Sequence, residues 1–295
     1  MTSAWQRTAL RALLLGQVPQ TGGYAMSAPT LQAQIDAAYA YEALFVPALF
    51  GQWAAKVADA AQLKSGQRVL DVASGTGILA REIASRTGSL GRVVGIDPSP
   101  GMNAVARKLA PALEWREGAA ESLPFPDGSF DAVVSQFGLM FFTDRRQALR
   151  EMLRVLTPEG RLVIAVWDSL ENMPAYASEV ALVERMAGQQ AADALRAPFV
   201  LGDRKELATL FSETGVASAQ VTTHRGTARF PSIRTMVEAD LRGWLPVMGV
   251  ILGEDQIEHM LQEARSALGS FAAANGEVAF DLSAHLVAVE KRWQS

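Results

Sequence analysis

A glycine-rich turn between a strand-like run and a helical segment constrains the fold of this chain more than any other feature of its sequence. Residues 68–72 (Arg-Val-Leu-Asp-Val) have the length and apolar content of a buried strand, and residues 73–77 follow as Ala-Ser-Gly-Thr-Gly. From Ile78 the pattern is helical. Glycines at such a turn let the backbone approach a ligand and leave amide groups free at the helix N-terminus. The turn therefore predicts a ligand-binding loop at the carboxyl edge of a parallel sheet.

Short apolar runs continue to alternate with helical patterns up to residue 167. Ser99 stands before Pro100 as an expected N-cap, and Thr143 has the same place before a later helix. This alternation is typical of βαβ units with helices on both faces of the sheet. We expect further strands at 93–96, 113–115, 132–135 and 162–167, and helices at 78–86, 100–109 and 144–156.

Helical patterns dominate after residue 167. We expect helical insertions at about 168–202 and 231–280, a helix at 206–215, and strands at 216–230 and 285–290. The whole pattern predicts an α/β fold. It is a Rossmann-like, seven-stranded, mostly parallel sheet with helices on both faces, an antiparallel last strand, and helical insertions that form a lid.

These patterns also suggest how the chain is divided. Residues 1–30 read as a flexible leader and residues 31–66 as a helical cap, rich in alanine and aromatic side chains. Residues 67–167 would form the ligand-binding core. Residues 168–295 would contribute the rest of the sheet and the two insertions.

The glycine loop alone does not identify its ligand. Gly75, Gly77 and Ala80 fit the Gly-x-Gly-x-x-Ala dinucleotide fingerprint, and Asp97 lies 20 residues beyond Gly77, where a ribose-binding acid is expected. Asp71, however, lies at the tip of the preceding strand. A carboxylate there would repel a pyrophosphate and would suit an ammonium group. Asp97 could accept two hydrogen bonds from ribose hydroxyls with either ligand.

A third segment, residues 118–131 (Gly-Ala-Ala-Glu-Ser-Leu-Pro-Phe-Pro-Asp-Gly-Ser-Phe-Asp), has no place in a dinucleotide half-domain. Together with Asp71-(x)3-Gly75-x-Gly77 and Asp97-Pro98-Ser99, it resembles the class I S-adenosylmethionine-dependent methyltransferases. The resemblance is to the group that includes the ubiquinone and menaquinone C-methyltransferases. It covers roughly residues 39–167 and, more loosely, the C-terminal strands. It implies S-adenosyl-L-methionine as the cofactor and direct displacement as the reaction.

The resemblance also implies a cofactor site. Asp71 would lie near the amino group of the methionine moiety, Asp97 would bind the ribose diol, and Met102 or Pro98 would pack on adenine. Ala119 stands where many relatives have an acid that accepts from the adenine amino group, so a contact worth about 0.5–1.5 kcal/mol is missing. The full set is Asp71, Ala73, Ser74, Gly75, Gly77, Asp97, Pro98, Met102, Ala119, Ala120, Glu121, Ser135 and Gln136.

Aromatic and apolar side chains near the predicted strand ends and on the helical segments suggest a pocket for a hydrophobic or aromatic acceptor. Ordinary core packing is the alternative for each of them taken singly. They are Tyr41, Phe50, Trp53, Phe137, Met140, Phe141, Trp167, Trp244 and Met248.

Composition excludes several other chemistries. The chain has no cysteine, and its three histidines, His224, His259 and His285, lack the spacing of a metal pair, so we expect no metal. A net charge of −4 without a basic run argues against nucleic acid as a partner. No apolar stretch reaches the length of a membrane span.

These exclusions leave a restricted set of expectations. We expect a cytoplasmic monomer or homodimer that acts on a small-molecule acceptor. We expect no catalytic triad, because a sulfonium donor is already activated. No catalytic base can be assigned, because candidate side chains are sparse. The competing hypotheses are an S-adenosylmethionine-binding protein that is non-catalytic or repurposed for another reaction, and a nicotinamide oxidoreductase.

Overall fold

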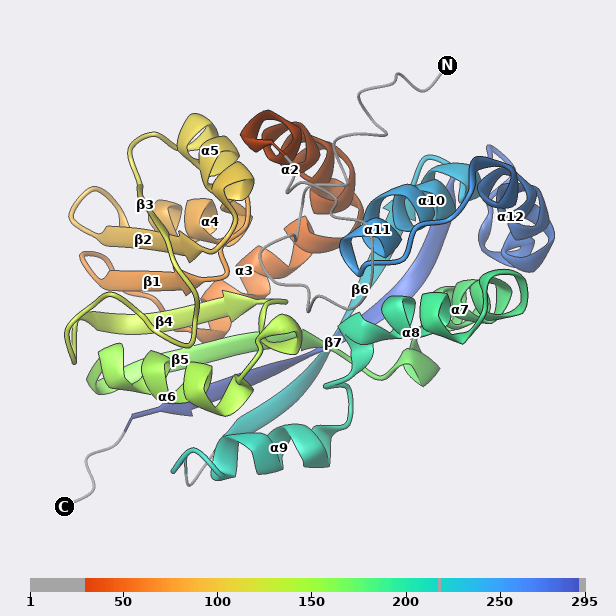
Figure 1. The fold of residues 1–295 in the computed structure, drawn as a ribbon. Coiled ribbons are helices and arrows are strands. Elements are labelled where there is room, and N and C mark those ends of the chain that lie inside the picture. Colours follow the sequence, from red (N-terminus) through yellow and green to blue (C-terminus); the bar gives the residue numbers. More distant parts are fainter. Residues whose placement is uncertain (1–29, 217–218, 292–295) are drawn as a thin grey trace, which may run out of the picture.

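Seven strands form one sheet in the order β3-β2-β1-β4-β5-β7-β6 (Figure 1). The structure is a computed structural model that describes residues 30–216 and 219–291. Most of the predicted leader therefore lies outside the described residues. Neighbouring strands from β3 to β5 pair in parallel, whereas β7 runs antiparallel to both β5 and β6. The strands are β1 Arg68–Val72, β2 Arg92–Asp97, β3 Glu114–Glu117, β4 Phe130–Gln136, β5 Leu156–Trp167, β6 Gln220–Phe230 and β7 Val278–Glu290. The predicted α/β fold is confirmed.

Helices cover both faces of this sheet. Figure 1 shows α6 and α9 on one face and α3 and α4 on the other, with α2 lying beside α5. The central strands are consequently buried on both sides, as parallel strands usually are. These helices are α2 Leu31–Phe45, α3 Gly51–Ala60, α4 Ile78–Thr87, α5 Pro100–Leu109, α6 Arg145–Val155 and α9 Arg204–Ser212. A five-residue π-helical segment, η2 (Val46–Phe50), joins α2 to α3.

The two helical insertions gather beyond the carboxyl ends of the parallel strands (Figure 1). The first contains α7 (Pro174–Ala187) and α8 (Gln189–Arg196). The second contains α10 (Ile233–Ala239), the π-helical segment η6 (Asp240–Trp244), α11 (Leu245–Val247) and α12 (Glu254–Ala267). Short 3₁₀ turns complete the described elements at Leu139–Phe141 (η3), Leu170–Asn172 (η4), Ala197–Phe199 (η5) and Gly269–Phe271 (η7).

Helix caps agree with the sequence in one case and differ in another. Ser99 caps α5 as predicted, because its hydroxyl accepts from the Met102 amide at 3.3 Å. Thr143 is not the cap of α6. Asp144 takes that role, since its backbone is extended and its carboxylate accepts from the Gln147 amide at 2.9 Å.

The last strand is longer than predicted. β7 begins at Val278 rather than at residue 285, and the predicted helical stretch up to residue 280 ends earlier, at Ala267. The extension exists because β6 pairs with β7 along its whole length, from Gln220 opposite Ala288 to Phe230 opposite Val278. Long-range pairing of this kind leaves little trace in the local pattern of residues 278–284.

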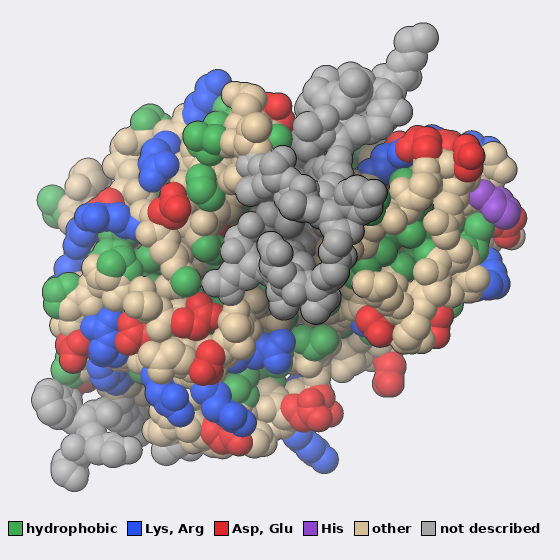
Figure 2. All heavy atoms as spheres, in the orientation of Figure 1, with side chains coloured by type: hydrophobic (Ala, Val, Ile, Leu, Met, Phe, Trp, Pro, Cys, Tyr) green, Lys and Arg blue, Asp and Glu red, His purple; other side chains and the backbone are tan. Residues whose placement is uncertain are grey.

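The surface of the described residues mixes both signs of charge. Figure 2 shows basic and acidic side chains interspersed on the visible face, around smaller apolar areas. Within residues 30–216 and 219–291, no helix is long and apolar enough to cross a membrane.

Candidate functional site

The glycine loop joins β1 to α4, and its two glycines have different surroundings. Both lie in the left-handed region, Gly75 with φ +54° and Gly77 with φ +87°. A Cβ on Gly77 would lie 2.2 Å from the ring of Trp115, whereas a Cβ on Gly75 would meet none of the described residues within 4 Å. Gly77 is therefore required by packing, and Gly75 borders open space. Trp115, which the sequence analysis did not single out, also packs against Gly95.

Asp97, at the end of β2, holds the loop. One carboxylate oxygen accepts from the Gly75 amide and the other from the Ser99 amide, both at 2.9 Å. Burial raises the pKa of Asp97 to about 6, although these two amide hydrogen bonds oppose the shift. Each oxygen keeps a lone pair for a further donor.

Asp71 lies fully buried at the end of β1. Burial raises the pKa of its carboxyl group well above the ordinary value, and the nearby charge of Asp97 raises it further. A hydrogen bond from the Ala80 amide acts in the opposite direction. Two buried carboxyl groups thus share the carboxyl edge of β1 and β2, where a cation would relieve the cost of ionising them.

A small cavity of about 30 Å³ opens beside Asp71. Its volume is enough for a water molecule. It is lined by Tyr41, Asp71, Ala73, Ser74, Gly75, Thr76, Ile78, Leu79 and Gln136. Tyr41, predicted as an acceptor-pocket residue, therefore lies against the glycine loop.

Several buried polar atoms at this edge have no hydrogen-bond partner among the described residues. They are Asp71 Oδ2, Ser74 Oγ, Ser135 Oγ and Gln136 Oε1. Ser135 and Gln136 end β4, which lies next to β1. A buried polar atom without a partner costs about 1–3 kcal/mol, so such a group of atoms is typical of a polar ligand site.

The residues predicted for the adenine end are more dispersed in their contacts. Met102 is buried and packs with Ala38 of α2, while Pro98 and Ala119 are exposed and Ala120 is buried. The carboxylate of Glu121 accepts from the amides of Thr143 and Asp144 at 2.9 and 3.3 Å. Glu121 therefore binds the two residues that precede α6, a contact that the sequence did not reveal.

Five of the predicted acceptor-pocket residues form one aromatic cluster: Tyr41, Phe50, Trp53, Phe137 and Trp167. Phe137 stacks on Trp167 with 3.8 Å between ring centroids and 11° between planes. Trp53 meets both rings edge-on, and Tyr41 stacks on Phe50 at 5.3 Å. Phe137 has φ +57°, which is rare for a bulky residue and is found mainly where surrounding structure imposes it.

The remaining predicted pocket residues lie apart from this cluster's ring contacts. Phe141 packs on Trp244 of the second insertion at 5.3 Å, and the Trp244 indole donates to the Ala194 carbonyl at 2.7 Å. Met140 is buried, whereas Met248 is about one-third exposed.

The structure reveals a further contact to the glycine loop, from Glu42 of α2. Thr76 donates its hydroxyl to one oxygen of Glu42 at 2.5 Å, and Arg81 donates to the other at 2.7 Å. No sequence signal could have found this contact, because the partners are 34 and 39 residues away from Glu42.

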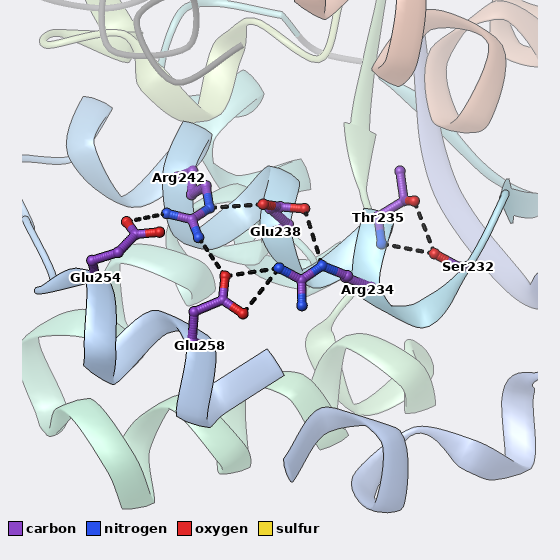
Figure 3. A network of polar contacts seen from close by, with 7 residues as sticks. All are labelled: Ser232, Arg234, Thr235, Glu238, Arg242, Glu254 and Glu258. Carbon is purple, nitrogen blue, oxygen red and sulfur yellow. Dashed lines mark hydrogen bonds and ion pairs between the residues drawn. The ribbon is translucent and has the colours of Figure 1, made fainter. Parts of the chain in front are cut away.

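An ion-pair network fastens the second insertion (Figure 3). Arg242 donates to Glu238, Glu254 and Glu258 at 2.8, 2.5 and 2.9 Å. Arg234 donates to Glu258 at 2.7 Å, so the two arginines share that carboxylate (Figure 3). The network links α10 and η6 to α12. The part of the chain that the structure describes holds no group of three side chains suited to a metal ion.

Comparison with known proteins gives this geometry a class. Residues 70–164 match the model of a methyltransferase domain family. The demethylmenaquinone methyltransferase of Thermus thermophilus is 47% identical over 117 residues, which are 38% of this chain and 53% of that protein. The ubiquinone/menaquinone biosynthesis C-methyltransferase of Hahella chejuensis is 42% identical over 126 residues, 41% of this chain and 51% of that protein. The chain thus spans about half the length of these relatives.

Solved structures extend the likeness of fold beyond the matched segment. The YcgJ protein of Bacillus subtilis has a TM-score of 0.54 at 22% identity, over 82% of this chain and 99% of its own. Phosphoethanolamine N-methyltransferase 2 of Haemonchus contortus has a TM-score of 0.55 at 18% identity, over 89% of this chain and 58% of its own.

The fold and the matched segment define a class I methyltransferase domain. Residues 70–164 form a methyltransferase domain, as the sequence motifs predicted.

Proposed function

We propose that the chain transfers a methyl group from S-adenosylmethionine to oxygen, carbon or nitrogen of a small hydrophobic or aromatic metabolite. The observation that carries the proposal is the position of Tyr41. Its side chain lines the cavity beside Asp71 and also stacks on Phe50 of the aromatic cluster. The cofactor loop and an apolar acceptor wall are therefore neighbours, as a direct displacement requires.

The residues at the carboxyl edge fit the polar end of the cofactor. The free oxygen of Asp71 suits an ammonium group, and the unpartnered Ser74 and Gln136 suit the remaining polar atoms of an amino-acid moiety. Asp97 keeps acceptor capacity for two ribose hydroxyls. The open space at Gly75 leaves room for the ligand to approach the backbone.

When bound, the cofactor supplies a methyl group already activated by a sulfonium charge. The chain's own contribution is then positioning, which is worth up to about 7–11 kcal/mol when two reactants are held in line. Asp71 and Asp97 would orient the donor, and the aromatic cluster would hold the acceptor and exclude water. This division of labour requires no catalytic triad.

The names of the relatives support an aromatic or quinone-like acceptor. One is named a demethylmenaquinone methyltransferase and the other a ubiquinone/menaquinone biosynthesis C-methyltransferase, and both are similar to the core of this chain. The stacked pair of Phe137 and Trp167 would suit a flat ring. The helical insertions lie outside the matched segment 70–164. We therefore expect the insertions, rather than the shared core, to determine which acceptor binds.

Titration calorimetry tests the cofactor site. We expect heat on adding S-adenosylmethionine and none on adding NAD. The variant Asp97→Ala should lower the affinity about tenfold or more, because two charge-assisted hydrogen bonds are lost. Binding of NAD in place of S-adenosylmethionine would favour an oxidoreductase, and an unchanged affinity of Asp97→Ala would refute the ribose role.

Transfer itself is tested by incubating the protein with methyl-labelled S-adenosylmethionine and a cell extract. We expect a labelled small molecule in mass spectrometry. Cofactor binding without any labelled product would support a non-catalytic S-adenosylmethionine-binding protein.

The setting of the protein follows the same reasoning. We place it in the cytoplasm as a monomer or homodimer with a small-molecule acceptor and no nucleic-acid partner. The net charge of −4 and the mixed charges on the face shown in Figure 2 support the absence of a nucleic-acid partner.

A further inference from the structure

The C-terminal end of α2 is fastened to the middle of the glycine loop. Glu42 receives one hydrogen bond from Thr76, which lies between Gly75 and Gly77, and an ion pair from Arg81 of α4. Arg81 also donates to the Thr76 carbonyl at 2.7 Å. The three side chains thus close a ring of contacts around the loop. Both charged side chains are about three-quarters buried, which strengthens the pair relative to an exposed one.

This ring of contacts sets the place of Tyr41. Tyr41 precedes Glu42 and lies over the loop, where it closes the cavity beside Asp71. Burial raises the pKa of its hydroxyl, and the charges of Asp97 and Glu42 raise it further. The cavity that remains has about 30 Å³, far less than the volume of a nucleoside-sized ligand. Tyr41 is the one lining residue that comes from α2, so movement of this end of α2 away from the loop would enlarge the cavity.

The two helices joined by η2 are anchored to different parts of the molecule. α3 is held to the sheet, because both polar atoms of the Gln52 amide bond the backbone of Thr227 in β6 at 2.8 Å. α2 reaches the loop through Glu42. Between them lies the π-helical segment η2, which contains Pro47 and ends before Gly51. A Cβ on Gly51 would lie 3.1 Å from the Val46 carbonyl oxygen, so a side chain at this position would be crowded. Irregular helical joints of this kind are where helices bend.

We propose that Glu42, Thr76 and Arg81 form a latch that closes α2 over bound cofactor, with the ring of Tyr41 as a further cofactor-contacting group. The inference rests on the proposed function, because it assigns α2 to the same site. Glu42 is a positioning residue in this arrangement, since it acts through the loop and through Tyr41. Because Tyr41 also stacks on Phe50, closure of the latch would complete the acceptor wall.

The test measures binding of S-adenosylhomocysteine, the reaction product, by calorimetry and by stopped-flow dissociation with the full chain. Glu42→Gln and Thr76→Val should each raise the dissociation rate and the Kd about tenfold, because each opens the ring of contacts. Thr76→Ser keeps the hydroxyl and should stay within about twofold of the wild type. Tyr41→Ala should resemble Glu42→Gln, whereas Tyr41→Phe keeps the closing ring and should resemble the wild type.

Glu82→Gln is the matched control. Glu82 is also a partly buried acid in an ion pair, but its partner is Arg86 of the same helix rather than a residue of the glycine loop. The latch is refuted if Glu42→Gln releases the product at the wild-type rate, or if Glu82→Gln accelerates release equally. A wild-type chain that does not bind S-adenosylhomocysteine would instead contradict the proposed function itself.

Discussion

At the scale of single residues, Gly75 and Gly77 of the glycine loop are required for different physical reasons. Gly77 is held by its neighbour, since the ring of Trp115 occupies the space that a side chain would need. Gly75 faces open space and donates its amide to Asp97. The first serves the packing of β3 against the loop, and the second serves the approach of a ligand.

Replacement by alanine should separate these roles. Gly77→Ala should lower the free energy of unfolding by about 2–4 kcal/mol, because a left-handed backbone and an overpacked ring act together. Gly75→Ala should cost about 1 kcal/mol, from backbone conformation alone, and should weaken cofactor binding more than stability. Urea unfolding measures both. Gly253→Ala is the control, because Gly253 has an ordinary φ of −69° and open space around it. Equal losses for Gly75→Ala and Gly77→Ala would contradict the argument.

At the scale of elements, the π-helical segment η6 connects the insertions to one another. Asp240 meets Glu179 of α7, Arg242 bonds acids of α10 and α12, and Trp244 reaches α8 and Phe141. Alternate residues of one short segment thus contact different helices. A regular α-helical turn would direct these side chains differently. The wider π-helical turn therefore lets one segment contact several helices.

The network around Arg242 should contribute measurably to the stability of the second insertion. Its side chain is only 10% exposed, and removing it leaves the mostly buried Glu238 with Arg234 at 3.7 Å as its remaining ion-pair partner. We expect Arg242→Ala to lower the free energy of unfolding by about 1–3 kcal/mol and to speed limited proteolysis between α10 and α12. Arg146→Ala breaks the exposed pair with Glu213 and should cost less than about 1 kcal/mol. Similar losses in the two variants would show that the network adds nothing beyond a surface pair.

At the scale of the whole molecule, the two insertions meet at a pair of buried acids, Glu179 and Asp240, close to Tyr176. Burial raises the pKa of Asp240 to about 7, and the neighbouring Glu179 opposes the shift. Burial also raises the pKa of Glu179, and the neighbouring Asp240 raises it further. Two such groups cannot both ionise at low cost, so the contact holds a proton near neutral pH.

This contact predicts how stability depends on pH. The native pKa of Asp240 lies above its unfolded value near 4, so the native state keeps a proton that the unfolded state releases. The contribution to stability is therefore full below about pH 4 and is lost as the pH rises towards 7. Asp240→Asn removes this titration. It should be more stable than the wild type by at least about 1 kcal/mol at pH 8, with little difference at pH 4.

Urea unfolding of Asp240→Asn across pH 4–8 measures the effect. Asp281→Asn, an exposed position on β7, is the matched control and should keep the wild-type profile. Parallel profiles for the wild type and Asp240→Asn would rule out a shared proton at this contact.

The candidate site was predictable to the extent that its signals are local. The strand-turn-helix pattern and the positions of Asp71 and Asp97 at strand ends follow from neighbouring residues alone. The Ser99 cap and the positions of most strands followed for the same reason, although β5 and β7 begin earlier than predicted, at Leu156 and Val278. The local pattern also misled elsewhere. It placed the cap of α6 on Thr143, although the adjacent Asp144 has the better geometry, and it ended the last helical stretch too late.

The sequence by itself determined the alternation of elements, the glycine loop and the carboxylates at the strand ends, because each depends on contacts within a few residues. Only the tertiary structure decided which distant side chains meet there. Four such contacts join residues far apart in the chain. They are the hydrogen bond from Thr76 to Glu42, the packing of Trp115 on Gly77, the stacking of Phe137 on Trp167, and the pairing of β6 with β7. Such contacts arise when the sheet closes and its loops are brought to one edge, so no local periodicity records them.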